Sequence, residues 1–228
     1  MSALSQTILV IHIGCGFLAL GTGFFSMINR KGSKNHKLTG KIFFGGMTGI
    51  FISATILSVI RPNPFLFMVA FFSYYLACSG YRALYLKANA KLKAAWLDWV
   101  IGSIGFAFGL GLIVFSFHWF QMRGFWGFVP LTFGSLCVVT AFRDLINFYR
   151  PPQNNQWRLI SHGSKMGGAF ASTVTAFIVT NFTMGTYTWV LWILPGILIG
   201  TWINRKLQIF KIAADKSNNL NMIKKEAQ

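Results

Sequence analysis

Residues 166–204 read MGGAFASTVTAFIVTNFTMGTYTWVLWILPGILIGTWIN and contain no charged side chain in 39 positions. A helix that crosses the hydrocarbon core of a bilayer needs about 20 mostly apolar residues, because each adds 1.5 Å toward a thickness of roughly 30 Å. The stretch is therefore too long for one membrane-spanning helix and suits two. The polar, turn-forming sequence NFTMGT at residues 181–186 predicts the break between them.

The rest of the chain repeats this pattern. Apolar runs occupy residues 7–28, 42–60, 65–86, 95–120 and 124–142, and the last stretch divides into 166–183 and 187–203. Only 11% of the 228 residues are charged, against about 25% in soluble domains, and the mean hydropathy is +0.54. These values exclude a soluble globular protein, a disordered chain and a disulfide-stabilised secreted module. We predict an all-α, polytopic membrane helix bundle with seven transmembrane helices.

The basic residues predict the orientation of this bundle. Segments 30–41, 82–93 and 143–165 and the tail after residue 204 together hold 19 of the 21 Lys and Arg residues, and the opposite face holds only Arg61 and Arg123. Because basic residues accumulate on the cytoplasmic side, we expect the N-terminus outside and the C-terminus inside. The net charge of +17 then indicates contact with anionic lipid headgroups, and we expect no nucleic-acid partner.

The domain organisation is simple. Residues 1–205 are predicted to form a single transmembrane domain, and residues 206–228 a basic, polar cytoplasmic tail that we expect to be disordered. Residues 1–7 carry no Lys or Arg, so the first run is interpreted as a retained span and not as a signal peptide. The three cysteines lie within apolar runs without a Cys-x-x-Cys motif, which argues against a disulfide framework or a cysteine zinc site.

Small residues recur at helical spacing and predict which faces point inward, because they let neighbouring helices approach closely. The four stripes are Gly16, Ala19 and Gly23; Gly45, Gly49 and Ser53; Gly102, Gly105 and Gly109; and Gly163, Gly167 and Ala171.

Two ionisable residues share these inward faces. Asp98 lies on the face of the Gly102 stripe and His12 on the face of the Gly16 stripe. An intramembrane carboxylate is by default a candidate functional residue. The alternative for Asp98 is a residue at the start of a helix with a cationic partner such as Arg82. The alternative for His12 is a neutral side chain satisfied by a hydrogen bond to a neighbouring helix.

The predicted topology separates the four histidines by depth. His36 and His162 precede the second and sixth spans on the cytoplasmic side, whereas His12 and the interfacial His118 lie in the outer halves of their spans. A cytoplasmic-side polar site is therefore predicted, and its members are His36, Arg82, Asp98, Asp144 and His162. Two imidazoles with a carboxylate suit zinc or iron, and two imidazoles on opposite sides of a plane suit a b-type haem.

Several sequence motifs carry a resemblance. They are Ile11-His12-Ile13, His36-Lys-Leu-Thr-Gly40, Ser79-Gly-Tyr-Arg82, Ala141-Phe-Arg-Asp144 and His162-Gly-Ser-Lys-Met166, followed by Thr175-Ala-Phe177 and Asn181. Together they resemble bacterial membrane proteins of the family called domain of unknown function 2306. The resemblance implies that His12, His36, Arg82 and His162 belong to the family pattern and that His118 does not. It implies a bacterial inner (plasma) membrane location and no established activity.

Three hypotheses for function follow. In the first, His36 and His162 are ligands of a metal ion or b-type haem, with Asp98 or Asp144 as a further ligand and Arg82 as an anion partner. In the second, the protein is a small transporter or binding protein for an anionic or lipid ligand, with the inner histidines in its polar lining. In the third, it is a non-catalytic membrane scaffold or assembly subunit whose polar groups satisfy each other.

Overall fold

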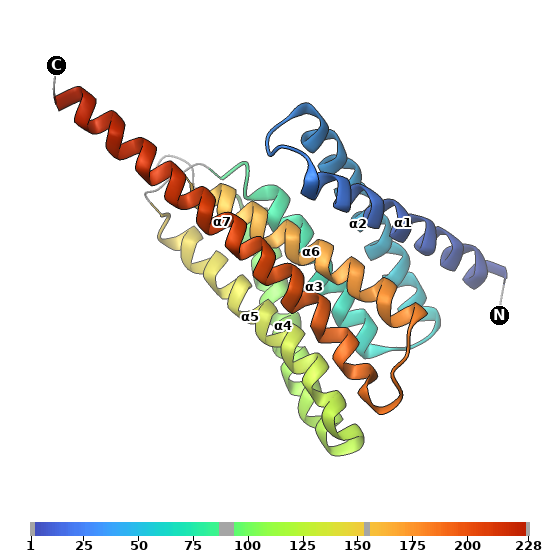
Figure 1. Cartoon of the computed structure of the whole chain (residues 1–228). Coiled ribbons are helices and arrows are strands. Elements are labelled where there is room, and N and C mark those ends of the chain that lie inside the picture. The colour runs from blue at the N-terminus through green and yellow to red at the C-terminus, as the bar shows by residue number, and fades with distance from the viewer. Residues whose placement is uncertain (1–2, 87–93, 153–155, 227–228) are drawn as a thin grey trace.

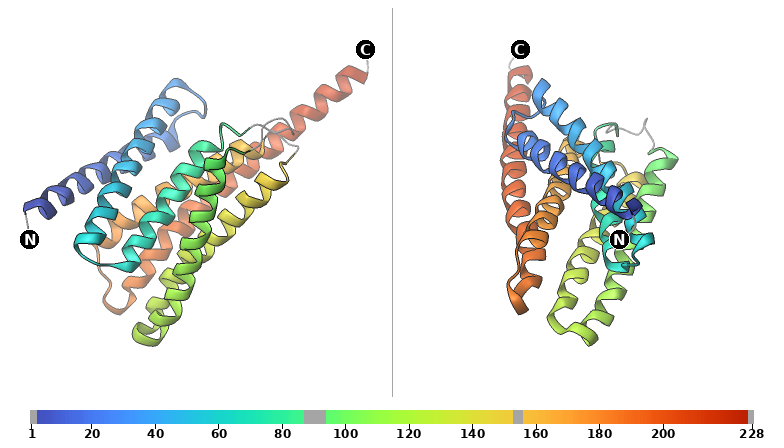
Figure 2. Two further views of the ribbon diagram at one scale, coloured as in Figure 1. Left: turned by 180° about the vertical axis from the view of Figure 1, so that it is seen from behind. Right: turned by 90° about the vertical axis from the view of Figure 1, so that its right-hand side faces the viewer.

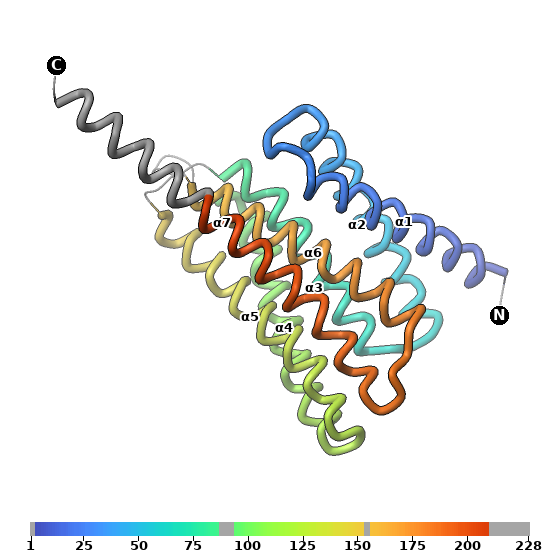
Figure 3. Tube along the Cα trace, viewed as in Figure 1, coloured from blue at the N-terminus to red at the C-terminus, as the bar shows by residue number. Residues whose placement is uncertain are grey.

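The computed structural model describes residues 3–86, 94–152 and 156–226, with side chains as far as residue 209 (Figure 3). These residues form no strand, so the predicted all-α class is confirmed. The helices are α1 (Ala3–Ile28), α2 (Lys34–Ile60), α3 (Pro64–Arg82), α4 (Trp96–Arg123), α5 (Phe128–Tyr149), α6 (Trp157–Asn181) and α7 (Thr188–Glu226), with short 3-10 helices at Gly124–Gly127 and Gly185–Tyr187.

Consecutive helices run in opposite directions (Figure 1), and all consecutive pairs except α5 and α6 pack against each other. Helix α1 packs along α2, α4 along α5, and α6 along α7, while α3 contacts α2, α4, α5 and α6. The α1–α2 pair therefore lies on one side of the molecule, as the two further views also show (Figure 2). Helices α3 and α6 make up the middle of the bundle, because each contacts helices on both sides of it.

Several helices have the length and composition of membrane spans. Five segments of the described chain meet both requirements: Ala3–Ile28, Lys34–Ile60, Pro64–Arg82, Trp96–Tyr149 and Gly185–Ile209. The fourth of these contains both α4 and α5. Helix α6 does not meet the requirements of length and composition, because its basic side chains and its many hydroxyl groups lower its hydropathy. Long apolar helices of this kind are typical of a membrane protein.

Two helices begin earlier than the hydropathy pattern predicts. Helix α2 begins at Lys34 and not at residue 42, and α6 begins at Trp157 and not at residue 166. The start of α2 is fixed by Ser33, whose backbone is extended and whose Oγ accepts a hydrogen bond from the amide of His36 at 3.2 Å. Such N-caps satisfy amides that have no partner within the helix. His36 and His162 consequently belong to helices and not to loops.

The expected disorder of the tail is wrong, because helix α7 continues from the last apolar run to Glu226. The basic residues Lys87, Lys91 and Lys93, which contribute to the predicted orientation, lie outside the described residues.

The small-residue stripes mark most of the close helix contacts. Gly102, Gly105 and Gly109 are all buried, and a Cβ on Gly105 would lie 2.6 Å from the ring of Tyr75. In α2, the prediction is wrong for Gly45, which is exposed while Gly46 packs against Ala19, and it is confirmed for Gly49 and Ser53, which face Cys15 and the interior.

Candidate functional site

Ionisable side chains gather where α2, α4 and α6 begin, an end of the bundle that we call the histidine end after His36 and His162. Because consecutive helices are antiparallel, the end of α3 lies at this end too (Figure 1). All five residues of the predicted polar site belong to these elements or to the last turns of α5. The structure arranges them as two separate ion pairs and one pair of histidines, and not as a single cluster of ligands.

The first ion pair joins Arg82 and Asp98. Arg82 is the last residue of α3, and its Nε contacts Oδ1 of Asp98 while its Nη2 donates to Oδ2 at 2.9 Å. Asp98 lies in the first turn of α4 and also accepts a hydrogen bond from the amide of Ala95 at 2.9 Å. The structure thus shows the second of the alternatives for Asp98, a residue at a helix start with Arg82 as its cationic partner. Such a carboxylate stabilises the helix start.

The second ion pair joins Asp144 of α5 and Lys165 of α6. The Lys165 ammonium donates to Oδ1 and Oδ2 of Asp144 at 2.5 and 2.6 Å, and the hydroxyl of Tyr75 donates to Oδ2 at 2.6 Å. Asp144 is 3% exposed and Lys165 is 8% exposed. A buried charge is tolerated when it is paired and hydrogen-bonded, and this group connects α3, α5 and α6 in that way.

Sequence reasoning missed the roles of Lys165 and Tyr75. Lys165 counted as a loop cation on the cytoplasmic face, but it is buried within helix α6. Tyr75 lies in an apolar run and gave no separate signal. The spacing of Lys165 with Ala169 and Ser172 on one helical face could have indicated an earlier start of α6.

His36 and His162 lie side by side although they are far apart in the sequence. Their ring centroids are 6.5 Å apart, and the ring planes are nearly perpendicular at 85°. Nδ1 of His36 lies 3.0 Å from the backbone oxygen of Ser26, and Nδ1 of His162 lies 2.9 Å from the backbone oxygen of Gly80. A carbonyl oxygen only accepts, so each Nδ1 carries the proton and each Nε2 keeps its lone pair.

This tautomer is the one that metal-binding histidines commonly adopt, since a carbonyl that holds Nδ1–H orients the ring. Within the described part of the chain, no hydrogen-bond partner occupies either Nε2. Metal–nitrogen bonds of about 2.0–2.1 Å place the centroids of two opposed imidazoles roughly 6.5 Å apart. The observed separation of 6.5 Å is therefore compatible in distance with two imidazole ligands of one metal ion.

The carboxylates expected to complete this site do not do so. Among the described residues, no group of three or more His, Cys, Asp and Glu side chains is arranged to hold a metal ion. Asp98 and Asp144 each have a cationic partner instead. This arrangement excludes a closed four-ligand site built from the described side chains and leaves a pair of imidazoles.

A cationic side chain, Lys31, acts electrostatically on His162 at the histidine end. Lys31, in the turn between α1 and α2, donates to the backbone oxygens of Ser26 and Met27 at 3.1 and 2.9 Å, and burial lowers its pKa from the ordinary value. A metal that carries its own anionic ligands suits this environment better than a bare divalent cation, because a basic surrounding repels added positive charge.

The two remaining histidines take no part in this arrangement. Nδ1 of His12 lies 2.9 Å from Oγ of Ser53 on α2, so the structure shows the hydrogen bond to a neighbouring helix that was the alternative for His12. His118 lies near the end of α4, remote from the histidine end, and is exposed beside Phe115. The interpretation of His118 as a peripheral residue is consistent with this position.

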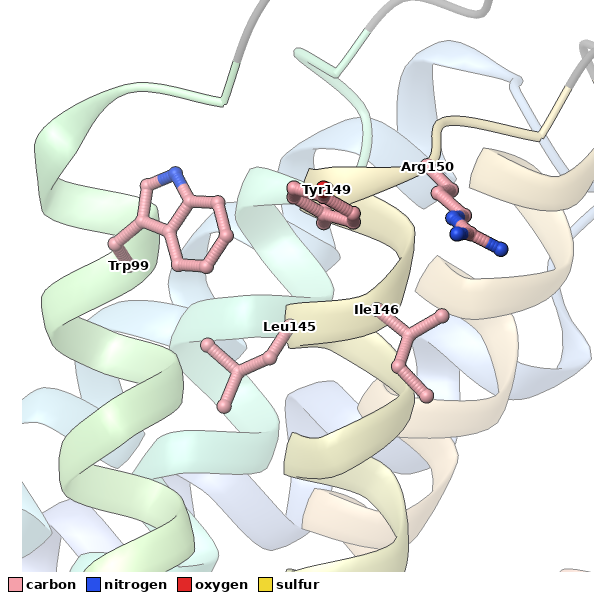
Figure 4. Close-up of a pocket in the computed structure, with 5 residues that line it drawn as sticks. All are labelled: Trp99, Leu145, Ile146, Tyr149 and Arg150. Atoms are coloured by element: carbon pink, nitrogen blue, oxygen red, sulfur yellow. The ribbon is translucent and has the colours of Figure 1, made fainter.

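A shallow pocket of about 500 Å³ opens on the outer side of α4 and α5, near the histidine end (Figure 4). Trp99 closes it from α4, while Leu145, Ile146 and Tyr149 of α5 and the adjoining Arg150 form the rest. Trp, Tyr and Arg side chains are enriched where a membrane protein meets lipid headgroups. The pocket holds no carboxylate or histidine, and it adds no ligand to the site.

Comparisons with known proteins add no further constraint. No family model matches the chain, and neither curated proteins nor solved structures include a significant match. A function for this chain therefore has to be argued from the geometry of its own residues.

Proposed function

We propose that this protein is a seven-span membrane metalloprotein in which Nε2 of His36 and Nε2 of His162 bind one metal centre. The observation that carries the proposal is the pair of rings 6.5 Å apart, each with its Nδ1 proton held by a backbone oxygen. The two histidines come from different helices and are 126 residues apart in the sequence. The fold therefore brings two imidazole rings from distant parts of the sequence to the same end of the bundle.

The membrane arrangement is part of the proposal. Helix α6 contacts α1, α3 and α7, so its charged and hydroxyl side chains have protein neighbours even though the helix is less apolar than the other six. Spanning helices tolerate polar groups where those groups face the interior of a bundle. The asymmetry of the basic residues supports a cytoplasmic histidine end, and the resemblance to bacterial membrane proteins supports the inner membrane of a bacterial cell. The motifs around His36, Arg82 and His162 favour membership of the domain of unknown function 2306 family.

A b-type haem fits the electrostatics of the site better than a bare ion. Its propionates would bring negative charge to a region where Lys31 acts on His162 and both carboxylates are already paired with cations. His36 and His162 would hold such a group through their Nε2 atoms. When bound, the haem would supply one-electron chemistry, and the chain would supply ligands, ring orientation and positive charge.

The test is metal analysis of protein purified in detergent without a polyhistidine tag. We expect close to one equivalent of iron and a haem absorption spectrum in the wild-type protein. His36→Ala and His162→Ala should each lose both signals, while His118→Ala, remote from the site, should retain them. Zinc or copper without a haem spectrum would retain the imidazole site and reject the haem.

Two results would contradict the proposal. One is a folded wild-type protein that contains no metal, and the other is an equal metal content in all three variants. Either result would favour the scaffold hypothesis, in which the ion pairs Arg82–Asp98 and Asp144–Lys165 serve only to join helices.

A further inference from the structure

A second space in the described part of the chain lies away from the histidine end. A cavity of about 830 Å³ opens between the α1–α2 pair and helices α3, α6 and α7. It reaches from Arg61 and Asn63, in the turn between α2 and α3, to Met47 in the middle of α2. Its volume lies within the range of about 300–1,000 Å³ that is typical of sites for small molecules.

The wall of this cavity changes in character from its mouth to its depth. Arg61, Asn63 and Asn181 lie where α2 ends, α3 begins and α6 ends, so one polar rim surrounds the mouth. The deeper wall is mainly apolar and includes Leu20, Ile50, Phe133 and Trp192. A polar rim above an apolar interior matches a molecule with a polar head and a hydrocarbon chain.

The charge of the residues that line the cavity indicates which kind of polar head group it binds. Among the described residues that line the cavity, Arg61 carries the only full charge, and none of them is a carboxylate. Oδ1 of Asn63 accepts a hydrogen bond from the backbone amide of Leu66 at the start of α3, so the side chain of this rim residue is held in place. A guanidinium at a mouth without acidic neighbours attracts an anion.

The deeper part of the cavity wall contains no charged group that requires a charged partner from a bound molecule. Its one histidine, His12, is anchored through Nδ1 to Ser53, and Oγ of Ser53 in turn donates to the backbone oxygen of Gly49 at 2.6 Å. The hydroxyl proton is used there, so His12 is the donor in the bond to Ser53 and is satisfied as a neutral ring. A hydrocarbon chain can therefore lie beside it without exposing an unpaired ion.

We propose that this cavity binds a single-chain anionic lipid of the fatty-acid type, with its carboxylate at Arg61 and its chain directed past His12 toward Met47. The site is independent of the metal site, because none of its lining residues belongs to the histidine end. Apolar burial of the chain supplies the affinity, and Arg61 selects the charge of the head.

The experiment uses the full chain in detergent and oleic acid that carries a photoreactive diazirine on its chain. After illumination, mass spectrometry locates the attached residues. We expect saturable labelling at Leu20, Ile50 or Trp192, and at least a fivefold reduction by excess unlabelled oleate. Oleyl alcohol, which has the same chain and a neutral head, should compete at least fivefold more weakly.

Two matched pairs of variants locate the site. Gly16 lines the cavity and Gly14 does not, while a Cβ on either glycine has open space around it. Gly16→Leu should therefore place a side chain in the cavity and reduce the saturable labelling at least fivefold, and Gly14→Leu should leave the labelling unchanged. Arg61→Gln should weaken competition by oleate at least fivefold, and Arg123→Gln, at the same end of the bundle, should not.

Labelling that is not saturable and spreads over exposed positions such as Leu110 and Val114 of α4 would overturn the proposal, since it would report the general lipid surface. Unchanged labelling in Gly16→Leu would also overturn it. Equal competition by oleate and oleyl alcohol would reject the role of Arg61 and the anionic head.

Discussion

Replacing Asp144 tests whether its ion pair with Lys165 connects the centre of the bundle. In Asp144→Asn, the ammonium of Lys165 keeps its charge in a place that is 8% exposed and loses its partner at 2.5–2.6 Å. Removing one member of a buried ion pair costs about 3–5 kcal/mol, because the other charge is left uncompensated. We expect Asp144→Asn to lose about this much free energy of unfolding.

The reverse single variant and the double variant make the test specific. Lys165→Met leaves the carboxylate of Asp144 with only the hydroxyl of Tyr75, so a similar loss of about 3–5 kcal/mol is expected. Combining Asp144→Asn with Lys165→Met removes both charges, and an asparagine oxygen still accepts from Tyr75. A neutral pair of similar volume commonly restores the stability, so the double variant should lie within about 1–2 kcal/mol of the wild type.

The assay is reversible unfolding of the four proteins in mixed detergent and SDS micelles, followed by tryptophan fluorescence. The double-mutant cycle isolates the interaction between the two residues, because contributions from the rest of the chain cancel. If the two single losses simply add in the double variant, or if either is below about 0.5 kcal/mol, the pair does not stabilise the bundle and the reasoning is refuted.

Two further predictions concern the packing and the histidine end. Gly105→Leu should lose about 1–3 kcal/mol of unfolding free energy, because its Cβ would lie 2.6 Å from the ring of Tyr75, whereas Gly14→Leu meets no neighbour and should cost almost nothing in the same assay. Ser33→Ala removes the N-cap that precedes His36 and should cost about 1 kcal/mol. Ser33→Ala should also reduce metal retention during dialysis. Ser33→Asp, which caps the helix equally well, should retain metal as the wild type does. Equal retention in the two variants would contradict a role of the N-cap in positioning His36.

Much of the helical organisation follows from the apolar runs, because hydropathy over about 20 residues reports the length of a span directly. The break at residues 181–186 coincides with the end of α6 and the start of α7. Helix starts were predicted less well. Hydropathy does not report a capping serine such as Ser33 or a helical turn that carries polar side chains, so the first turns of α2 and α6 were placed in loops.

The pairing of Asp98 with Arg82 was one of the alternatives predicted from the sequence, whereas the pairing of Asp144 with Lys165 was not. The sequence placed His36 and His162 at one end of the bundle, because topology depends on local charge and hydropathy. It did not indicate that Asp144 pairs with Lys165, since that contact depends on how α5 and α6 are arranged around α3. Tyr75 illustrates the same limit, because a hydroxyl within an apolar run has no sequence signal apart from its partner.

Close packing between α3 and α6 separates the proposed metal site from the proposed lipid cavity. A Cβ on Gly80 would lie 2.9 Å from Cβ of Lys165, and one on Gly168 would lie 3.1 Å from the side chain of Leu76, so the two helices are in tight contact near the histidine end. The cavity instead opens farther along the bundle, where the α1–α2 pair faces α3 and α6. Gly16→Leu, which places a side chain in the cavity, should therefore leave the positions of the His36 and His162 rings unchanged. Loss of lipid labelling together with loss of metal would show that these two regions are coupled, and retention of the metal would show that they act independently.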